Sequence, residues 1–377
     1  MDWIPHADAL ADRVSRPGSP WRLVVAATPR HGFVPRWWKA GGGTWALQKG
    51  SSDPEAWLAT AYSDRTLVTQ VGPLHADHAT QEDKPVGKPT SSSTLPSLVV
   101  QMYEHAAIEP TSTVLDVGTG SGYGTAVLCE RVGVDRVTSI DVDAYLVKAA
   151  TERLDEIGLR PRMLVGDATG PLPGPVDRIV AMVSVRPVPP SWLEALPVGG
   201  RLATTITNTS MILTATKTKD GSAVGRIERD WAMFMATRAG RDYPPRHHAL
   251  VDKARTEDGE DIHIGRFPAL DVVEAWEVRS MLELSAPDIE HHFDDDGYTR
   301  TAIMVHPDGS WARAVQEGRS FPTVHQGGPR RLGNLLDEVR DYWLQHGQLP
   351  LHGALARVAP DGSIHLRRGR WTATISA

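Results

Sequence analysis

Residues Val114–Leu128 read VLDVGTGSGYGTAVL, an apolar run that leads into a glycine turn and then into a run with helical character. Glycines at 118, 120 and 122 let the backbone turn sharply and approach a ligand closely. Their G-x-G-x-G spacing differs from the G-x-G-x-x-G of dinucleotide sites, and no lysine follows in the register of a P-loop. The turn therefore predicts a ligand without a pyrophosphate or a triphosphate.

The chain around this turn alternates between apolar strands and amphipathic helices. Strands are expected at 113–117, 136–140, 162–165 and 178–183, and helices at 123–131, 144–157 and 191–196. This alternation predicts an α/β fold with a doubly wound, mostly parallel sheet. The carboxyl ends of parallel strands meet along one edge of the sheet, where ligands bind.

Acidic residues end the second and third of these strands. Asp141 lies where a carboxylate can accept hydrogen bonds from both hydroxyls of a ribose, and Asp167 lies where it can accept one from an adenine amino group. Taken singly, Asp141 fits a helix N-cap and Asp167 a turn former. Together with the glycine turn, they predict a class I, Rossmann-like methyltransferase that binds S-adenosyl-L-methionine and releases S-adenosyl-L-homocysteine. The candidate cofactor-binding residues are Gly118, Thr119, Gly120, Ser121, Gly122, Tyr123, Asp141, Val142, Asp167 and Ala168.

Composition limits the other possibilities. The chain has 377 residues, a formal net charge of −6 and one cysteine, and its pI is about 6.2. This charge argues against a nucleic-acid partner, and a single cysteine allows no internal disulfide. No run is long and apolar enough for a membrane span, and the first residues do not resemble a secretion signal, so a cytoplasmic protein is expected. The acidic IEHHFDDDGY (289–298) matches no metal-ligand spacing.

Several motifs outside the glycine turn resemble the protein-L-isoaspartate O-methyltransferase family. The turn itself is similar to the family motif VLEIGTGSGYxTAxL. TPRHGFVPRWW resembles the R-x-x-F-V-P signature, AYSDRTLVTQVG the A-Y-x-D-x-x-L stretch, LPVGGRLATTI the L-x-P-G-G-R-L strand, and DWAMFMATR a late strand ending in F-x-P-x-R. The resemblance covers residues 20–240. It implies methyl transfer from S-adenosylmethionine to a peptide carboxylate, after which the ester collapses to a succinimide.

A run of hydroxyl residues supplies the catalytic candidates Ser91, Ser92, Ser93 and Thr94. PTSSSTLPSLVVQM resembles the family segment T-I-S-Q-P-x-x-V-A-x-M, which implies Thr94 at the family's active-site serine and Ser92 at its threonine. A carboxylate is already anionic at pH 7, so the enzyme must desolvate and orient it rather than deprotonate it. Hydroxyl groups suit that task. The alternative is a flexible linker or a helix N-cap.

Two residues after the fourth strand are substrate-binding candidates, Ser184 and Arg186 in MVSVRPVPP. Arg186 can pair with an acidic peptide through two parallel hydrogen bonds. The alternative is an arginine on the surface without a role in binding.

The chain is expected to divide into three parts. Residues 1–85 form an N-terminal segment with a strand-like WRLVVAA, 86–240 the methyltransferase domain, and 241–377 an appended C-terminal α+β domain for substrate recognition. In the last part, HPDGSW and APDGSI predict hairpin turns, and RRLGNLLDEVRDYWLQHG predicts a helix that ends at a glycine.

The size and layout of this C-terminal part, including GPRRLGNLLDEVRDYW followed by VAPDGSIHL, resemble variants of the family from gene clusters for ribosomally made peptides such as lanthipeptides and graspetides. That resemblance implies methylation of an aspartate side chain in a precursor peptide that is already cyclised, which drives aspartimide or isoaspartate formation. One alternative is a general protein-L-isoaspartate (D-aspartate) O-methyltransferase for protein repair. Another is a non-catalytic peptide-binding protein, against which the intact glycine turn, Asp141 and Asp167 argue.

Overall fold

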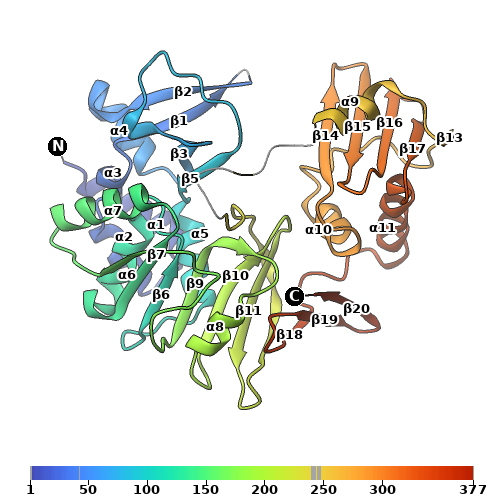
Figure 1. Ribbon diagram of the computed structural model, residues 1–377. Coiled ribbons are helices and arrows are strands. Elements are labelled where there is room, and N and C mark those ends of the chain that lie inside the picture. Colours follow the sequence, from blue (N-terminus) through green and yellow to red (C-terminus); the bar gives the residue numbers. More distant parts are fainter. Residues whose placement is uncertain (1, 42, 239–242, 244–247, 377) are drawn as a thin grey trace.

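The computed structural model describes residues 2–41, 43–238, 243 and 248–376, and a ten-stranded sheet lies at its centre (Figure 1). Five strands on one side of this sheet pair in parallel, and their spatial order from the edge inward is β8, β7, β6, β9, β10. Their bounds are β6 (Val114–Val117), β7 (Val137–Asp141), β8 (Arg162–Val165), β9 (Arg178–Val185) and β10 (Arg201–Ile206). The expected α/β fold is confirmed, and these strands bring their carboxyl ends to one edge.

Five antiparallel strands extend the sheet beyond β10. They are β11 (Met211–Lys217), β12 (Ala223–Trp231), β18 (Leu355–Val358), β19 (Ile364–Arg368) and β20 (Trp371–Ile375). The sheet is therefore parallel on one half only. The sequence predicted one appended domain for all residues after 240. In the structure, β18, β19 and β20 belong to the central sheet.

The central strands are apolar on both faces because both faces are covered. Leu115 and Ile179 belong to one buried cluster, whereas their neighbours Val114 and Val180 belong to the cluster on the opposite face. Successive side chains of a strand point to opposite faces, which explains this alternation. The helices that accompany the parallel strands are α5 (Pro96–His105), α6 (Tyr123–Val132), α7 (Ala144–Glu156) and α8 (Pro190–Ala195), with the short η3 (Val134–Arg136).

The N-terminal residues form a small sheet and several helices beside the glycine turn. The strands are β1 (Arg36–Gly41), β2 (Thr44–Lys49), β3 (Leu67–Val71), β4 (Leu74–His75) and β5 (Pro89–Ser93). The helices are α1 (Ile4–Val14), α2 (Trp21–Ala27), α3 (Arg30–Phe33), η1 (Gly50–Ser52), α4 (Pro54–Ala61) and η2 (Ala76–His78). Most of the hydroxyl run is thus an edge strand paired with β3, and not a linker.

The prediction of a strand at WRLVVAA is wrong, since these residues form α2. Trp21 and Val25, one helical turn apart, are buried, while Leu23 between them is 71% exposed. A strand would place all three side chains on the same face. Packing against α1 and α6 selects the helix over the β-propensity of the two valines.

Arg30 connects the N-terminal segment to the hydroxyl run. Its guanidinium is fully buried and donates to five carbonyl oxygens, those of Ala61, Ser63, Arg65, Ser93 and Thr94, at 2.7–3.3 Å. Burial lowers its pKa to about 10, so it stays charged at neutral pH. One side chain therefore holds together two segments that are distant in the sequence.

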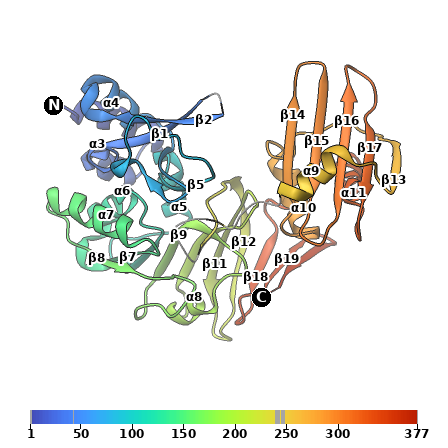
Figure 2. The same cartoon turned by 45° about the horizontal axis from the view of Figure 1, so that its top comes forward.

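The C-terminal part contains a five-stranded antiparallel sheet, shown in orange in Figures 1 and 2. Its strands are β13 (Asp261–Ile264), β14 (Glu290–Asp295), β15 (Thr299–Val305), β16 (Trp311–Glu317) and β17 (Thr323–Gly327), with helices α9 (His248–Thr256), α10 (Trp276–Ser285) and α11 (Leu332–His346). Both expected hairpins are present, as β15–β16 and β18–β19, and α11 is followed by Gly347.

A single buried apolar cluster joins this part to the central sheet. It includes Leu202 and Leu213 of the methyltransferase strands together with Leu282 of α10 and Leu336 of α11. The C-terminal part therefore shares a core with the central sheet. Within the described ranges, no helix has the length and apolarity to cross a membrane, and no group of acidic, histidine or cysteine side chains has the geometry of a metal site.

We expect Arg30→Ala to lower the free energy of unfolding by about 3–5 kcal/mol, because it leaves five carbonyl groups with no charged donor. Urea unfolding measures the change. Arg22→Ala removes a partly exposed arginine paired with Asp8 and Asp12 and should lower the free energy of unfolding far less. Equal effects of the two substitutions would contradict this role of Arg30.

Candidate active site

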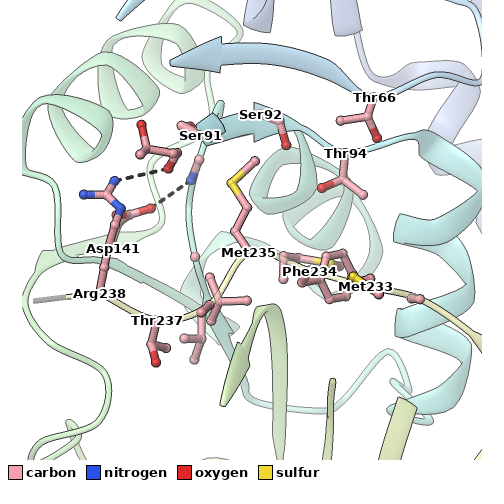
Figure 3. A pocket seen from close by; sticks show the side chains of 18 of the residues that line it. Thr66, Ser91, Ser92, Thr94, Asp141, Met233, Phe234, Met235, Thr237 and Arg238 are labelled. Atoms are coloured by element: carbon pink, nitrogen blue, oxygen red, sulfur yellow. Dashed lines mark hydrogen bonds between the residues drawn. The ribbon is translucent and has the colours of Figure 1, made fainter. Parts of the chain in front are cut away.

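A cavity of about 550 Å³ opens at the carboxyl edge of the parallel strands. The hydroxyl run, the glycine turn, the ends of β7 and β8, and the chain after β12 all contribute to its walls (Figure 3). Nine of the predicted site residues are among its walls, namely Ser91, Ser92, Thr94, Gly118, Gly120, Asp141, Val142, Asp167 and Ala168.

The glycine turn lies against the hydroxyl run and against β9. Gly118 has a φ of +91°, and a Cβ there would lie 2.9 Å from Cγ1 of Val183. Gly120 has a φ of +53°, and its Cβ would lie 3.0 Å from the carbonyl oxygen of Ser92. A side chain at either position would be strained and would push the two walls apart. The glycines thus let the predicted cofactor side and the hydroxyl side of the cavity meet.

Asp141 ends β7 and is held by backbone amides. Its Oδ2 accepts from the Gly120 N–H and its Oδ1 from the Asp143 N–H, both at 3.1 Å. Burial raises the pKa of this carboxyl, and these two amides act in the opposite direction. A carboxylate offers about four acceptor positions. Two therefore stay available for a pair of hydroxyls, as a ribose requires.

Asp167 lies at the other end of the same wall and is exposed. Its Oδ1 accepts from the N–H and the hydroxyl of Thr169, at 2.8 and 2.7 Å, while its Oδ2 has no partner in the described part of the chain. Trp192 Nε1 donates to the carbonyl of Ala168 at 2.7 Å and fixes this turn. The turn thus leaves one carboxylate oxygen open for an amino group.

Four of the predicted cofactor residues do not line the cavity and instead support the turn. Gly122 has a φ of +89°, and a Cβ there would lie 2.9 Å from that of Ala150 in α7. The Ser121 hydroxyl accepts from the N–H of Tyr123 at 3.4 Å, and the ring of Tyr123 is buried. Thr119 bonds to Ser139 at 2.7 Å. Their role in this structure is to shape the glycine turn from behind.

Asp116, which the sequence reading did not select, lies at the centre of this supporting layer. It is buried and accepts from the hydroxyls of Thr125 and Ser139, at 2.7 and 2.9 Å. Burial raises its pKa to about 6, although both hydroxyls lower it. Its position within VLDVG, two residues before the glycine turn, was the available signal.

The hydroxyl run divides between two environments. Ser92 and Thr94 project into the cavity near Met235 and Phe234, and Asp141 lies at its other end (Figure 3). Ser91 lines the cavity as well and accepts from the Thr69 hydroxyl at 3.0 Å. Ser93 is not part of the wall, and its hydroxyl is buried without a partner in the described chain. Three of the four catalytic candidates therefore face the same space.

Neither substrate-binding candidate lines the cavity. Ser184 is buried, with its backbone bonded to Met235 and Thr237. Arg186 forms an ion pair with Glu283 of α10, with Nη1 2.8 Å from Oε1. Burial raises the pKa of Glu283 to about 7, an effect that Arg186 opposes. Glu283 belongs to the C-terminal part, so the sequence around Arg186 gave no sign of this partner. The guanidinium that was predicted to bind an acidic peptide is thus engaged by a carboxylate of the same chain.

The chain after β12 forms a wall that the sequence reading described as a late strand. Regular pairing stops at Trp231, and the following residues run along the end of β9, where the Ser184 N–H donates to the Met235 carbonyl at 2.8 Å. Arg238 donates to the carbonyl of Thr90 at 3.2 Å (Figure 3). DWAMFMATR was the signal for this wall. Further lining residues that were missed are Thr66, Gln101, Met233, Phe234, Met235, Thr237, Arg238 and Trp276.

The family model and the sequence relatives identify one family. The family model described as Protein-L-isoaspartate(D-aspartate) O-methyltransferase (PCMT) matches residues 61–238. The protein-L-isoaspartate O-methyltransferase of Gloeobacter violaceus is 31% identical over 182 residues, which are 48% of this chain and 70% of that protein. The enzyme of the same name from Ignicoccus hospitalis is 37% identical over 134 residues, which are 34% of this chain and 63% of that protein.

A solved structure named protein-L-isoaspartate O-methyltransferase matches nearly the whole chain. The match covers 98% of this chain and 99% of that one, with a TM-score of 0.52 and 17% identity. At this identity the likeness concerns the fold alone. The likeness extends over the C-terminal sheet.

We expect Asp141→Ala to weaken S-adenosylmethionine binding about 100-fold, because two hydrogen bonds to a charged acceptor are lost. Isothermal titration calorimetry measures the dissociation constant. Asp155→Ala is the control, since its carboxylate is exposed and pairs with Arg160 on the surface. Unchanged affinity in Asp141→Ala, in a protein with an unaltered melting curve, would remove Asp141 from the cofactor site.

Proposed function

Because the chain belongs to the protein-L-isoaspartate O-methyltransferase family, we propose that it methylates the α-carboxylate of isoaspartyl residues with S-adenosylmethionine. The observation that carries the proposal is the close approach of the Gly120 backbone to the Ser92 carbonyl, which leaves no room for a side chain at position 120. It brings the acidic strand ends and the hydroxyl run to one cavity. A cofactor held at Asp141 and a carboxylate held at Thr94 would therefore share this space.

The two acidic strand ends and the tight turn fit the cofactor. Asp141 has two acceptor positions for ribose hydroxyls, and Asp167 has an oxygen open to an amino group. The turn supplies no lysine for a phosphate. When bound, S-adenosylmethionine supplies a methyl group from its sulfonium, so that one carbon–sulfur bond breaks as one carbon–oxygen bond forms.

The chain's own residues have to orient the carboxylate and exclude water from it. The substrate carboxylate is anionic at pH 7, and the reaction needs no general base. The hydroxyls of Ser92 and Thr94 can donate to one carboxylate oxygen and leave the other directed at the methyl group. Phe234 and Met235 on the facing wall exclude water from the reacting oxygen.

A second candidate function is maturation of a ribosomal peptide, in which the methylated group is an aspartate side chain of a pre-cyclised precursor. Trp276 of α10 favours it, because the C-terminal part thereby adds to the wall of the same cavity. The repair-type reaction needs no further assumption, and it is our first choice. A cytoplasmic location suits either reaction.

One assay separates the two functions. The protein is incubated with S-adenosylmethionine and a linear isoaspartyl peptide, its aspartyl twin, or a crosslinked precursor peptide, and products are followed by mass spectrometry. We expect one methyl group to be added to the linear isoaspartyl peptide only. Methylation or loss of water on the crosslinked peptide alone would establish the maturation reaction instead.

We expect Thr94→Ala and Ser92→Ala to lower kcat about 10- to 100-fold with little change in cofactor affinity, because each removes a donor that positions the carboxylate. Steady-state kinetics and calorimetry separate the two effects. Ser93→Ala, which removes a hydroxyl outside the cavity, should retain turnover. Normal turnover in both Thr94→Ala and Ser92→Ala would show that the hydroxyl run does not hold the substrate.

A further inference from the structure

A second hollow of about 480 Å³ lies beside the reaction cavity, between the central sheet and the C-terminal part. We call it the annex. It is lined by residues of β12, α10, the segment before β18, and β19, namely Arg229, Trp231, Glu277, Gln348, Leu349, His352 and Arg368. Its volume is in the range of ligand-binding sites.

Trp231 lines both the annex and the reaction cavity, so the two spaces adjoin at this residue. Trp276, on the wall of the reaction cavity, packs edge-on against Trp231 with ring centroids 6.2 Å apart. His352 packs on Trp231 from the annex, at 5.8 Å. Trp231 is 54% exposed and Trp276 37% exposed. Two large aromatic side chains thus remain accessible where the two spaces meet.

Some polar side chains of the annex form hydrogen bonds within the chain, and others have none among the described residues. Arg368 already donates to the carbonyls of Leu349 and His352, at 3.3 and 2.8 Å. Arg229 is exposed and makes no hydrogen bond or ion pair with any part of the chain that the structure describes. The buried Nε2 of His352 also has no hydrogen-bond partner there, and the nearest carboxylate oxygen, on Glu277, is 3.7 Å away.

We propose that the annex receives the stretch of substrate polypeptide that flanks the methylated residue, and that Arg229 selects an acidic side chain in that stretch. The proposal rests on the proposed function. A methylated residue within a polypeptide needs a path for the chain on each side of it. The annex supplies one such path, because it begins at the wall of the reaction cavity.

The chemistry of the annex fits an extended acidic peptide. Exposed tryptophan rings offer large contact area to a peptide at low conformational cost. An arginine with free N–H groups can bind a carboxylate through two parallel hydrogen bonds. The substrate class is therefore an isoaspartyl chain with a glutamate or aspartate within a few residues of the methylated position.

The test compares isoaspartyl peptides that carry glutamate, glutamine or lysine at each of the three positions on either side. We expect one position at which glutamate lowers KM relative to glutamine and lysine raises it. Arg229→Gln should raise KM for the glutamate peptide about threefold relative to the glutamine peptide, the size of effect typical of an exposed ion pair. Trp276→Ala should raise KM for all peptides more than it lowers kcat.

Two variants serve as matched controls. Arg357→Gln removes an exposed arginine of β18 that pairs with Asp220, and Trp343→Ala removes an exposed tryptophan of α11; neither lines the annex or the cavity. Both should keep the wild-type preference. Equal KM for glutamate and glutamine at every position, or a preference that survives Arg229→Gln, would overturn the proposal. Failure of the wild type to methylate any isoaspartyl peptide would instead overturn the proposed function, and this inference with it.

Discussion

The buried guanidinium of Arg30 is the constraint on which the reaction cavity depends. A charged group without water is tolerated only where hydrogen-bond acceptors surround it, and five carbonyl oxygens do so here. Two of these belong to Ser93 and Thr94, so the hydroxyl run takes its position from a residue of the N-terminal segment. The ring of Tyr123, at the start of α6, lies 5.4 Å from the guanidinium. One arginine therefore sets the hydroxyl run in place relative to the helix that follows the glycine turn.

The sequence predicted the parallel half of the sheet, and it placed the glycine turn and the acidic strand ends at one edge, for a physical reason. The ends of the strands can be predicted from apolar runs in the sequence. Gly118, Gly120 and Asp141 lie directly at such ends, so their positions could be predicted as well. The hydroxyl run was placed through family resemblance, and its division into cavity-facing and buried hydroxyls depends on pairing with β3. The sequence of the hydroxyl run does not indicate which strand it pairs with.

Three features that sequence reasoning missed depend on contacts between distant segments. The position of Arg186 at the end of β9 predicted a contact with an acidic peptide, but its carboxylate partner is Glu283 of α10. The apolar run Trp21–Ala27 predicted a strand, but these residues form a helix that packs against α1 and α6. The return of β18–β20 to the central sheet cannot be read from hairpin signals, because these specify a turn and not the strand against which the hairpin packs.

That return has a consequence for how the protein is made. β12 exposes an unpaired edge until β18 has been synthesised, and all of α9–α11 and the five-stranded sheet are translated in between. An open edge is a template for pairing with other chains. The C-terminal sheet, whose strands pair only with one another, can form during that interval. β12 can therefore pair with β18 only after the five-stranded sheet has been translated, which prolongs the time for which its edge is open to other chains.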